Sequence, residues 1–165
     1  MATTPAPGRP PDALRLKAVD PDDLAVISAQ IQDAILPVHD MAWDKPSLRF
    51  AMVVNRFCWE RPPRESEGRT VWYRTLCGLR IEGVHGVRQR GFDPVRERGR
   101  MLSVLALHPH PDGGLAIDFA GDGPHRPSVR LSVGAIEVVL EDRGEPWPTL
   151  WHPHHPEDDA GRPRP

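Results

Sequence analysis

Cysteine is scarce in this chain, and long hydrophobic runs are missing. The 165 residues include two cysteines, Cys58 and Cys77, which are too few for a disulfide framework. Both stand among apolar residues, where a free cysteine behaves as a small hydrophobic side chain. No segment approaches the roughly 20 apolar residues of a membrane-spanning helix, and no signal-peptide stretch follows the N-terminus. These absences predict a cytoplasmic protein that binds no membrane.

The signatures of common enzyme sites are absent as well. The sequence has no phosphate-binding G-x-x-x-x-G-K-[ST] loop, no metal-binding H-E-x-x-H helix and no G-x-S-x-G turn for a nucleophilic serine. Isolated Ser, His and Asp residues do not identify a catalytic triad, because a triad is recognised by its geometry. The sequence therefore gives no catalytic residue and no cofactor, and it favours a protein that is not an enzyme.

The formal net charge of −2 is close to neutral and gives no argument for a polyanionic partner. Lysine is rare, since only Lys17 and Lys45 among the 21 basic residues are lysines. One local basic run resembles an RNA-binding segment: Arg88, Arg90, Arg96, Arg98 and Arg100. Because only Phe92 offers a stacking ring there and acidic residues dilute the charge, a solvated loop is favoured and nucleic acid is not expected as a partner.

The two ends of the chain differ in composition from its middle. Residues 1–12 and 145–165 are rich in proline and lack apolar periodicity, so both are predicted to be disordered tails. The second tail also carries histidines. Residues 13–144 are numerous enough to bury about two-thirds of their chain surface in one core, which predicts a single globular domain.

A helix is predicted to begin after Asp20, which offers an N-cap side chain, with Pro21 in the first turn. Its apolar residues recur every three or four positions, and it should end before Pro37. Alternation of apolar and polar residues from Leu48 to Asn55 predicts a strand. The apolar phase changes after Asn55, which we interpret as a β-bulge; the alternative is that the strand ends there.

Shorter alternating segments separated by turn residues bring the expected number of strands to six or so. Residues 134–144 fit either a helix or a strand, and we favour a closing C-terminal helix. Together these elements predict an α+β fold with a strongly bent, mostly antiparallel sheet or partial barrel, one early helix and the closing helix. A small barrel of the pleckstrin-homology type is one candidate outline.

Several segments resemble a bacterial protein family, domain of unknown function 2948, which occurs in alphaproteobacteria. The resemblance is carried by LKAVDPDDLAVISAQIQDAILPVHDMAW at residues 16–43 and by RFAMVVNRFCWE at residues 49–60. Further similarity lies in VRQRGFD at 87–93, LSVLALHP at 102–109 and VRLSVGAIEVVLEDRG at 129–144. The resemblance implies a small soluble bacterial protein, and it transfers no catalytic residue.

A candidate contact site for a ligand or a protein partner lies at the proposed bulge: Asn55, Arg56 and Trp59. Bulges re-aim side chains and are common beside binding sites. An exposed Arg56 next to Trp59 would hold an anionic or planar ligand with its guanidinium and a ring face. The favoured alternative is that Phe57 and Trp59 fill the core while Arg56 caps a strand edge.

Histidines suggest a metal site in two places. His108 and His110 lie in one turn, and His125 lies in a later loop that could approach them to complete a set of ligands. Because spacing alone is weak support, a turn with incidental histidines is the favoured interpretation. A second group, in the C-terminal tail, would bind zinc or nickel loosely: His152, His154 and His155.

The same tail contains Trp147 and Trp151, and tryptophan is costly to leave in water. Docking of the tail on the domain's own surface is therefore favoured over docking on a partner. The leading functional hypothesis is a non-enzymatic protein-binding or scaffold domain that contacts another protein through an exposed sheet edge or the proline-rich tail. The alternative is a small-molecule or metal-binding protein, or an enzyme, that uses the loops around His108, His110 and His125.

Overall fold

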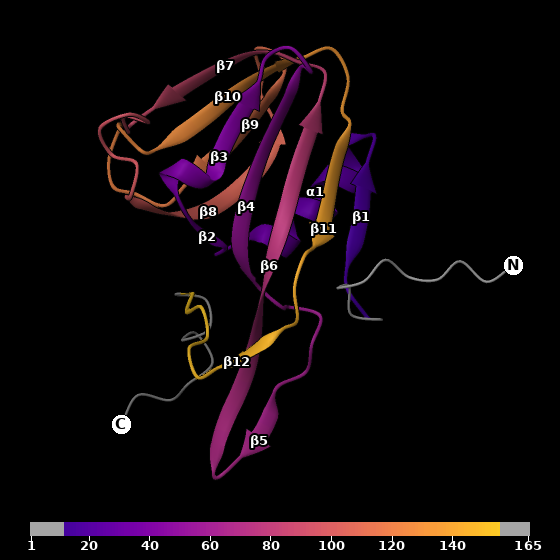
Figure 1. Ribbon diagram of the computed structural model, residues 1–165, viewed down its shortest axis with the longest axis vertical. Coiled ribbons are helices and arrows are strands. Elements are labelled where there is room, and N and C mark those ends of the chain that lie inside the picture. The colour runs from indigo at the N-terminus through magenta and orange to yellow at the C-terminus, as the bar shows by residue number, and fades with distance from the viewer. Residues whose placement is uncertain (1–11, 156–165) are drawn as a thin grey trace, which may run out of the picture.

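A computed structural model describes residues 12–155, which form one α-helix, one short 3-10 helix and a curved β-sheet (Figure 1). The helices are α1 (Pro21–Ile31) and η1 (Val38–Asp40). The strands are β1 (Arg15–Ala18), β2 (Ile35–Pro37), β3 (Met41–Asp44), β4 (Arg49–Phe57), β5 (Arg64–Ser66), β6 (Arg69–Glu82), β7 (Val84–Arg90), β8 (Met101–Pro109), β9 (Leu115–Phe119), β10 (Ser128–Val133), β11 (Val138–Asp142) and β12 (Trp147–Thr149). Residues 1–11 and 156–165, which hold most of the first predicted tail and the end of the second, lie outside the described residues.

The strands form one strongly bent sheet of antiparallel pairs. Its order is β1-β11-β6-β4-β2-β8-β9-β10-β7, while β3 pairs with β4, and β5 and β12 pair with β6. Register shifts between Val104 and Ala106 in β8 and between Ser132 and Val133 in β10 mark irregularities that add to the bend. The sheet curls round towards β3 and β4 without closing (Figure 1). The predicted α+β fold with a bent antiparallel sheet is confirmed.

The helix lies where the sequence predicts it. The Asp20 carboxylate accepts a hydrogen bond of 2.8 Å from the backbone N–H of Asp23, as expected of an N-cap. The helix ends at Ile31, and Asp33 adopts a left-handed φ of 61° as the chain turns into β2. The apolar stripe of α1 is buried, and the helix packs on β1, β4 and β8. It therefore covers the inner side of the sheet, behind β6 and β11 in Figure 1.

One hydrophobic core fills the space between the helix and the curved sheet. It consists of the apolar face of α1 and the inward-facing residues of the long strands. Phe50 of β4 and Val129 of β10 belong to this core and are both buried. These two residues lie at the edge of the core, where the sheet is open.

The predicted β-bulge at Asn55 is wrong. β4 pairs with β6 along its whole length without a register shift. The next inward-facing residue after Val54 is Arg56, and both side chains are fully buried. Because Arg56 is charged, the alternation of apolar and polar residues appears broken in the sequence. Phe57 is buried too, on the opposite face of the strand. The end of β4 is therefore covered on both faces, so buried and exposed residues do not alternate there.

The predicted closing helix is also wrong, since residues 138–142 form the strand β11. β11 is hydrogen-bonded on both sides, to β1 and to β6. Val138 and Leu140 are fully buried and their neighbours less so, which is the two-residue period of a strand. Beyond α1 and η1 the described chain forms no further helix, and neither of these two is long and apolar enough to cross a membrane.

Candidate functional site

The open seam of the sheet lies between β3 and β7. At one end the backbone N–H of Val84 donates to the carbonyl of Leu48 at 2.7 Å, and the indole N–H of Trp43 donates to the carbonyl of Val84 at 3.1 Å. At the other end the loop of residues 91–100 accepts two backbone hydrogen bonds from η1, of 2.9 and 3.0 Å. Between these ties β3 pairs only with β4, and β7 only with β10, among the described strands. The seam is therefore a gap with fixed ends.

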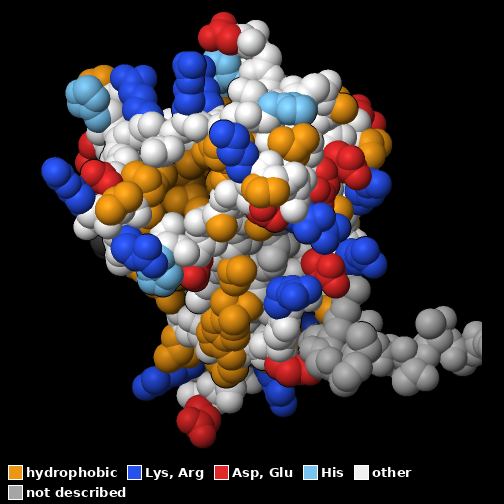
Figure 2. Space-filling view, turned by 45° about the horizontal axis from the view of Figure 1, so that its top comes forward, with side chains coloured by type: hydrophobic (Ala, Val, Ile, Leu, Met, Phe, Trp, Pro, Cys, Tyr) orange, Lys and Arg blue, Asp and Glu red, His pale blue; other side chains and the backbone are white. Residues whose placement is uncertain are grey.

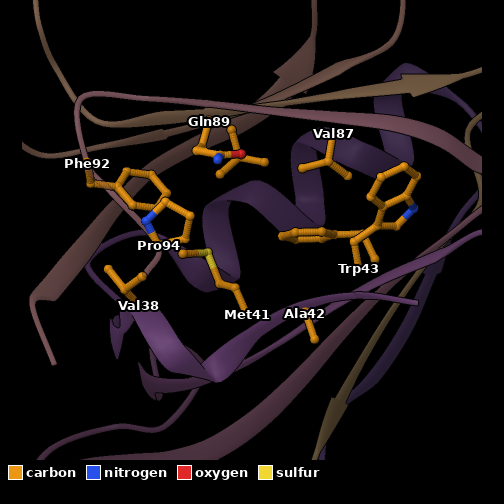
Figure 3. A pocket seen from close by; sticks show the side chains of 10 residues that line it. Val38, Met41, Ala42, Trp43, Val87, Gln89, Phe92 and Pro94 are labelled. Atoms are coloured by element: carbon orange, nitrogen blue, oxygen red, sulfur yellow. The ribbon is translucent and has the colours of Figure 1, made fainter. Parts of the chain in front are cut away.

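A pocket of about 350 Å³ occupies this gap. In Figure 3, Met41 and Trp43 of β3 face Val87 of β7 across the pocket, and Phe92 stands at one end. Figure 2 shows a hollow floored by hydrophobic side chains in the part of the molecule where Figure 1 places β3 and β7. The lining residues are Val38, Met41, Ala42, Trp43, Phe50, Val87, Gln89, Phe92, Pro94 and Val129.

The lining of the pocket suits an apolar group and offers no catalytic chemistry. Gln89 and Trp43 are the polar side chains in it, and the Trp43 N–H is already donated to a backbone carbonyl. No carboxylate, imidazole or thiol belongs to the lining set. Apolar pockets of this size with a few polar groups are typical of binding sites.

Arg56 occupies a closed cluster of charges near the far end of β4. Its guanidinium donates two hydrogen bonds of 2.7 Å to the carboxylate of Asp142 and two, of 2.7 and 3.0 Å, to that of Glu60. Arg56 is 0% exposed and Asp142 5% exposed. Burial alone would lower the pKa of Arg56, but the hydrogen bonds to the two carboxylates raise it above its ordinary value. The guanidinium is engaged on both sides and does not face an external anion.

The carboxyl group of Asp142 couples this cluster to pH. Burial alone would raise its pKa, but the hydrogen bonds and charge of Arg56, together with the backbone N–H of Leu14 at 2.9 Å, hold the pKa of Asp142 below its ordinary value of 3.8. A pKa that is lowered by folding contributes stability above the pKa of the unfolded chain, and this stability is lost as the pH falls through the folded value.

We therefore expect the free energy of unfolding to decline as the pH falls below about 4, with Asp142 responsible for part of the decline. Urea unfolding of the wild type and of Asp142→Asn across this pH range measures that part. The variant should be less stable than the wild type at neutral pH and less sensitive to acid. An Asp44→Asn control, at an exposed carboxylate, should keep the acid sensitivity of the wild type. Equal acid sensitivity in Asp142→Asn would contradict the assignment.

Both cysteines lie close to the Arg56 cluster, and both are free and buried. Burial raises the pKa of Cys58 to about 11, and it also raises the pKa of Cys77. A thiol must lose its proton to act as a nucleophile or a metal ligand. At neutral pH these two cysteines are protonated and serve as packing residues.

The other two residues of the predicted contact site, Asn55 and Trp59, lie apart from the Arg56 cluster. Successive residues of a strand point to opposite faces, so Asn55 and Phe57 share the face opposite to Arg56. Trp59 donates its indole N–H to the carbonyl of Gln32 at 3.2 Å, and its ring lies 4.6 Å from that of Phe57. The structure thus divides the three predicted residues between two faces of the sheet.

The face that carries Asn55 and Phe57 is covered by residues 145–155, which we call the strap. β12 pairs with β6, and the ring of His152 then lies 4.3 Å from Trp72 and 5.2 Å from Phe57. His155 Nε2 is 2.7 Å from an oxygen of Asp33. In Figure 1 β12 runs along the lower part of β6, and Figure 2 shows hydrophobic side chains gathered in that region. The described part of the predicted tail is docked on the domain itself.

Arg74, on β6 beneath the strap, is absent from the residues predicted from the sequence. It is 4% exposed, and its Nη1 donates to the carbonyl and the side-chain oxygen of Asn55 at 3.1 and 3.2 Å. Its Nη2 is buried without a hydrogen-bond partner. The rings of Phe57 and Trp151 lie 5.9 and 4.8 Å from its guanidinium carbon. No sequence signal marks Arg74, because these neighbours come from β4 and from the strap.

The structure does not assemble the histidines of the predicted metal site. His108 Nε2 lies 2.8 Å from Asp118, and this hydrogen bond raises the pKa of His108. His110 Nδ1 accepts the backbone N–H of Asp112 at 3.1 Å, and His125 is exposed. Within residues 12–155 no three His, Cys, Asp or Glu side chains come together in a group that could hold a metal ion.

Comparison with known proteins identifies one family. The family described as "Protein of unknown function (DUF2948)" matches residues 14–155. This range contains the pocket, the Arg56 cluster and the strap with Arg74. No curated protein and no solved structure matches the chain. The family match confirms the resemblance seen in the sequence, and the chain belongs to the DUF2948 family.

Proposed function

We propose that the protein is a non-enzymatic binding domain that holds an extended segment of another protein in the gap between β3 and β7. One apolar side chain of that segment fills the pocket. The observation that carries this proposal is the position of the pocket, which lies between two strand edges that have no strand partner on that side within the described residues.

The two strand edges supply the main-chain contacts of such a complex. An edge strand presents unpaired N–H and C=O groups that an added strand can satisfy. In β-strand addition these groups provide affinity, while pockets for alternate side chains provide specificity. The hydrogen bonds at both ends of the gap hold β3 and β7 in place before the partner arrives. The site is therefore preorganised, which lowers the entropic cost of binding.

The size and lining of the pocket favour one anchoring group. About 350 Å³ is near the lower limit for pockets that take drug-sized ligands. Met41, Trp43 and Phe92 line it with flexible and aromatic surface. A large aliphatic or aromatic side chain in the bound segment suits this lining best.

Two further proposals accompany this function. A cytoplasmic location is supported by Cys58 and Cys77, which are both free, because disulfides form mainly in oxidising compartments outside the cytoplasm. A pleckstrin-homology-like outline is supported by the bent antiparallel sheet with a helix packed on it.

A second candidate function uses the same pocket. A small apolar molecule would fit the volume and lining without any strand addition. The sequence had suggested small-molecule binding at the loops around His108, His110 and His125. This second candidate places such binding in the pocket between β3 and β7 instead.

Selection of phage-displayed random peptides on the immobilised full chain tests the proposed function. We expect enriched peptides with an alternating apolar pattern and one large apolar residue. In fluorescence polarisation Val87→Arg, which places a charge on the pocket wall, should weaken their binding by at least about tenfold. Val26→Arg is the matched control, because Val26 is 53% exposed on α1 and outside the pocket.

Two outcomes would count against the peptide proposal. Equal binding by wild type and Val87→Arg would move the site elsewhere. If no peptide is enriched but the dye 1-anilinonaphthalene-8-sulfonate binds the wild type and not Val87→Arg, the pocket takes small molecules and the second candidate replaces the first.

A further inference from the structure

β4 and β6 bury two arginines on opposite faces, and these two residues have opposite surroundings. Arg56 donates to four carboxylate oxygens. Arg74, equally enclosed, forms no ion pair with any Asp or Glu among the described residues and leaves Nη2 without a partner. The charge of Asp33 acts on Arg74, but its carboxylate accepts no hydrogen bond from Nη2. A buried guanidinium with an unpaired donor is costly. Arg56 is explained by its partners, whereas Arg74 requires another explanation.

The surroundings of Arg74 indicate what kind of ligand would accept hydrogen bonds from its unpaired Nη2. Nη2 offers two N–H donors. Burial lowers the pKa of Arg74, and a bound anion would raise that pKa again. Nη1 is already fixed by Asn55, so the guanidinium plane is held in one orientation. A planar carboxylate matches such an oriented fork better than a spherical ion does.

A slot for a flat ring lies next to Arg74. The His152 ring occupies it, in contact with Trp72 at 4.3 Å, Phe57 at 5.2 Å and Trp59 at 5.9 Å. Phe57 is shared between this slot and Arg74. An anion subsite and an aromatic slot therefore adjoin through one ring.

The strap residues above Arg74 are held by other kinds of contact than the start of the strap. β12 is hydrogen-bonded to β6, and its approach is fixed by a hydrogen bond of 3.0 Å from Thr75 to the carbonyl of Gly144. Trp151, which covers Arg74, is 54% exposed. Trp151 and His152 meet the domain through ring contacts. Pro153 is buried, and His155 Nε2 lies 2.7 Å from Asp33. Opening of the site would break these ring contacts, expose Pro153 and separate His155 from Asp33, while β12 keeps its pairing with β6.

We propose that Arg74 is the anion-binding residue of a second ligand site, covered by the strap, and that its ligand is a small aromatic carboxylate. The carboxylate pairs with the Arg74 guanidinium, and the ring takes the place of the His152 ring against Trp72 and Phe57. The strap competes with the ligand, so the apparent affinity of the full chain is the intrinsic affinity of the open site multiplied by the fraction of molecules in which the strap is open. This site lies outside the pocket between β3 and β7 and does not depend on the proposed function.

Isothermal titration of the full-length protein with benzoate tests the proposal. Trp151→Ala removes the cover and should bind benzoate at least about tenfold more tightly than the wild type. In the Trp151→Ala background, Arg74→Met should abolish this binding. Arg80→Met is the matched control, because Arg80 lies on the same strand but pairs with Glu82 at 2.8 Å. The control should bind benzoate as Trp151→Ala does.

Two comparison ligands separate the parts of the site. Benzyl alcohol has the ring without the charge and should bind much more weakly than benzoate. Phenyl phosphate tests the class of anion, and preference for it over benzoate would overturn the assignment to a carboxylate. Absence of benzoate binding by Trp151→Ala, or unchanged binding after Arg74→Met, would overturn the site itself. Arg74→Gln provides the same test if the methionine variant does not fold.

Discussion

Replacement of Arg56 with methionine is expected to lower the free energy of unfolding by about 3–5 kcal/mol, the usual cost of removing one partner of a buried ion pair. The loss comes mainly from Asp142, whose side chain is 6% exposed and would keep only the backbone N–H of Leu14 among its strong partners. Glu60, at 32% side-chain exposure, can turn to water and contributes less. Urea unfolding at neutral pH measures the change.

The matched control is Arg74→Met, the same substitution on the neighbouring strand. Because no carboxylate is hydrogen-bonded to Arg74, its removal breaks no buried ion pair, and we expect a change smaller than about 1 kcal/mol. A similar loss in both variants would show that the size of the side chain, and not the paired charge, is what matters at Arg56.

Replacement of Gly91 with alanine is expected to have the second large effect. Gly91 adopts a φ of +79°, and an added Cβ would lie 2.4 Å from the carbonyl oxygen of His125 and 2.9 Å from backbone atoms of Pro127. The left-handed conformation alone costs about 1–3 kcal/mol for a residue other than glycine. The contact adds to this cost, because backbone atoms must move to relieve it. The thermal unfolding midpoint should fall clearly.

The same change should also reach the pocket. Gly91 starts the loop that brings Phe92 and Pro94 to the pocket wall. A displaced loop should weaken a peptide selected for the pocket by at least about tenfold. Gly99→Ala is the control in the same loop, since its Cβ would meet no atom within 4 Å. The Gly99→Ala variant should keep the stability and the peptide affinity of the wild type. An equal loss in both variants would show that any glycine replacement in this loop is harmful, and that the close contact at Gly91 is not the cause.

The local parts of the fold could be predicted because their signals are local. The N-cap at Asp20, the stripe of α1 and the alternation in β4 each depend on residues a few positions apart. The same reasoning gave the wrong result for residues 134–144, because the segment fits both periods. Residues 138–142 form a strand because they pair with β1 and β6, which lie far away in the sequence.

The sites could not be predicted for the same physical reason. The pocket joins η1 and β3 to β7 and β10, so it exists only after the sheet has curled. Arg56 was singled out in the sequence by the break in apolar phase, but its burial depends on Asp142, 86 positions away. Arg74 is defined by the strap, which composition alone marks as a disordered tail.

The pairing of β1 with β11 has a consequence for how the chain matures. The first strand of the domain meets its partner only when residues 138–142 are available, and the same short stretch brings the counter-ion of Arg56. A nascent chain that ends before this point would carry an arginine at an inward position with no acid from β11 to neutralise it. Synthesis from the N-terminus therefore delays completion of the domain until residues 138–142 have been made, although β1 is synthesised first.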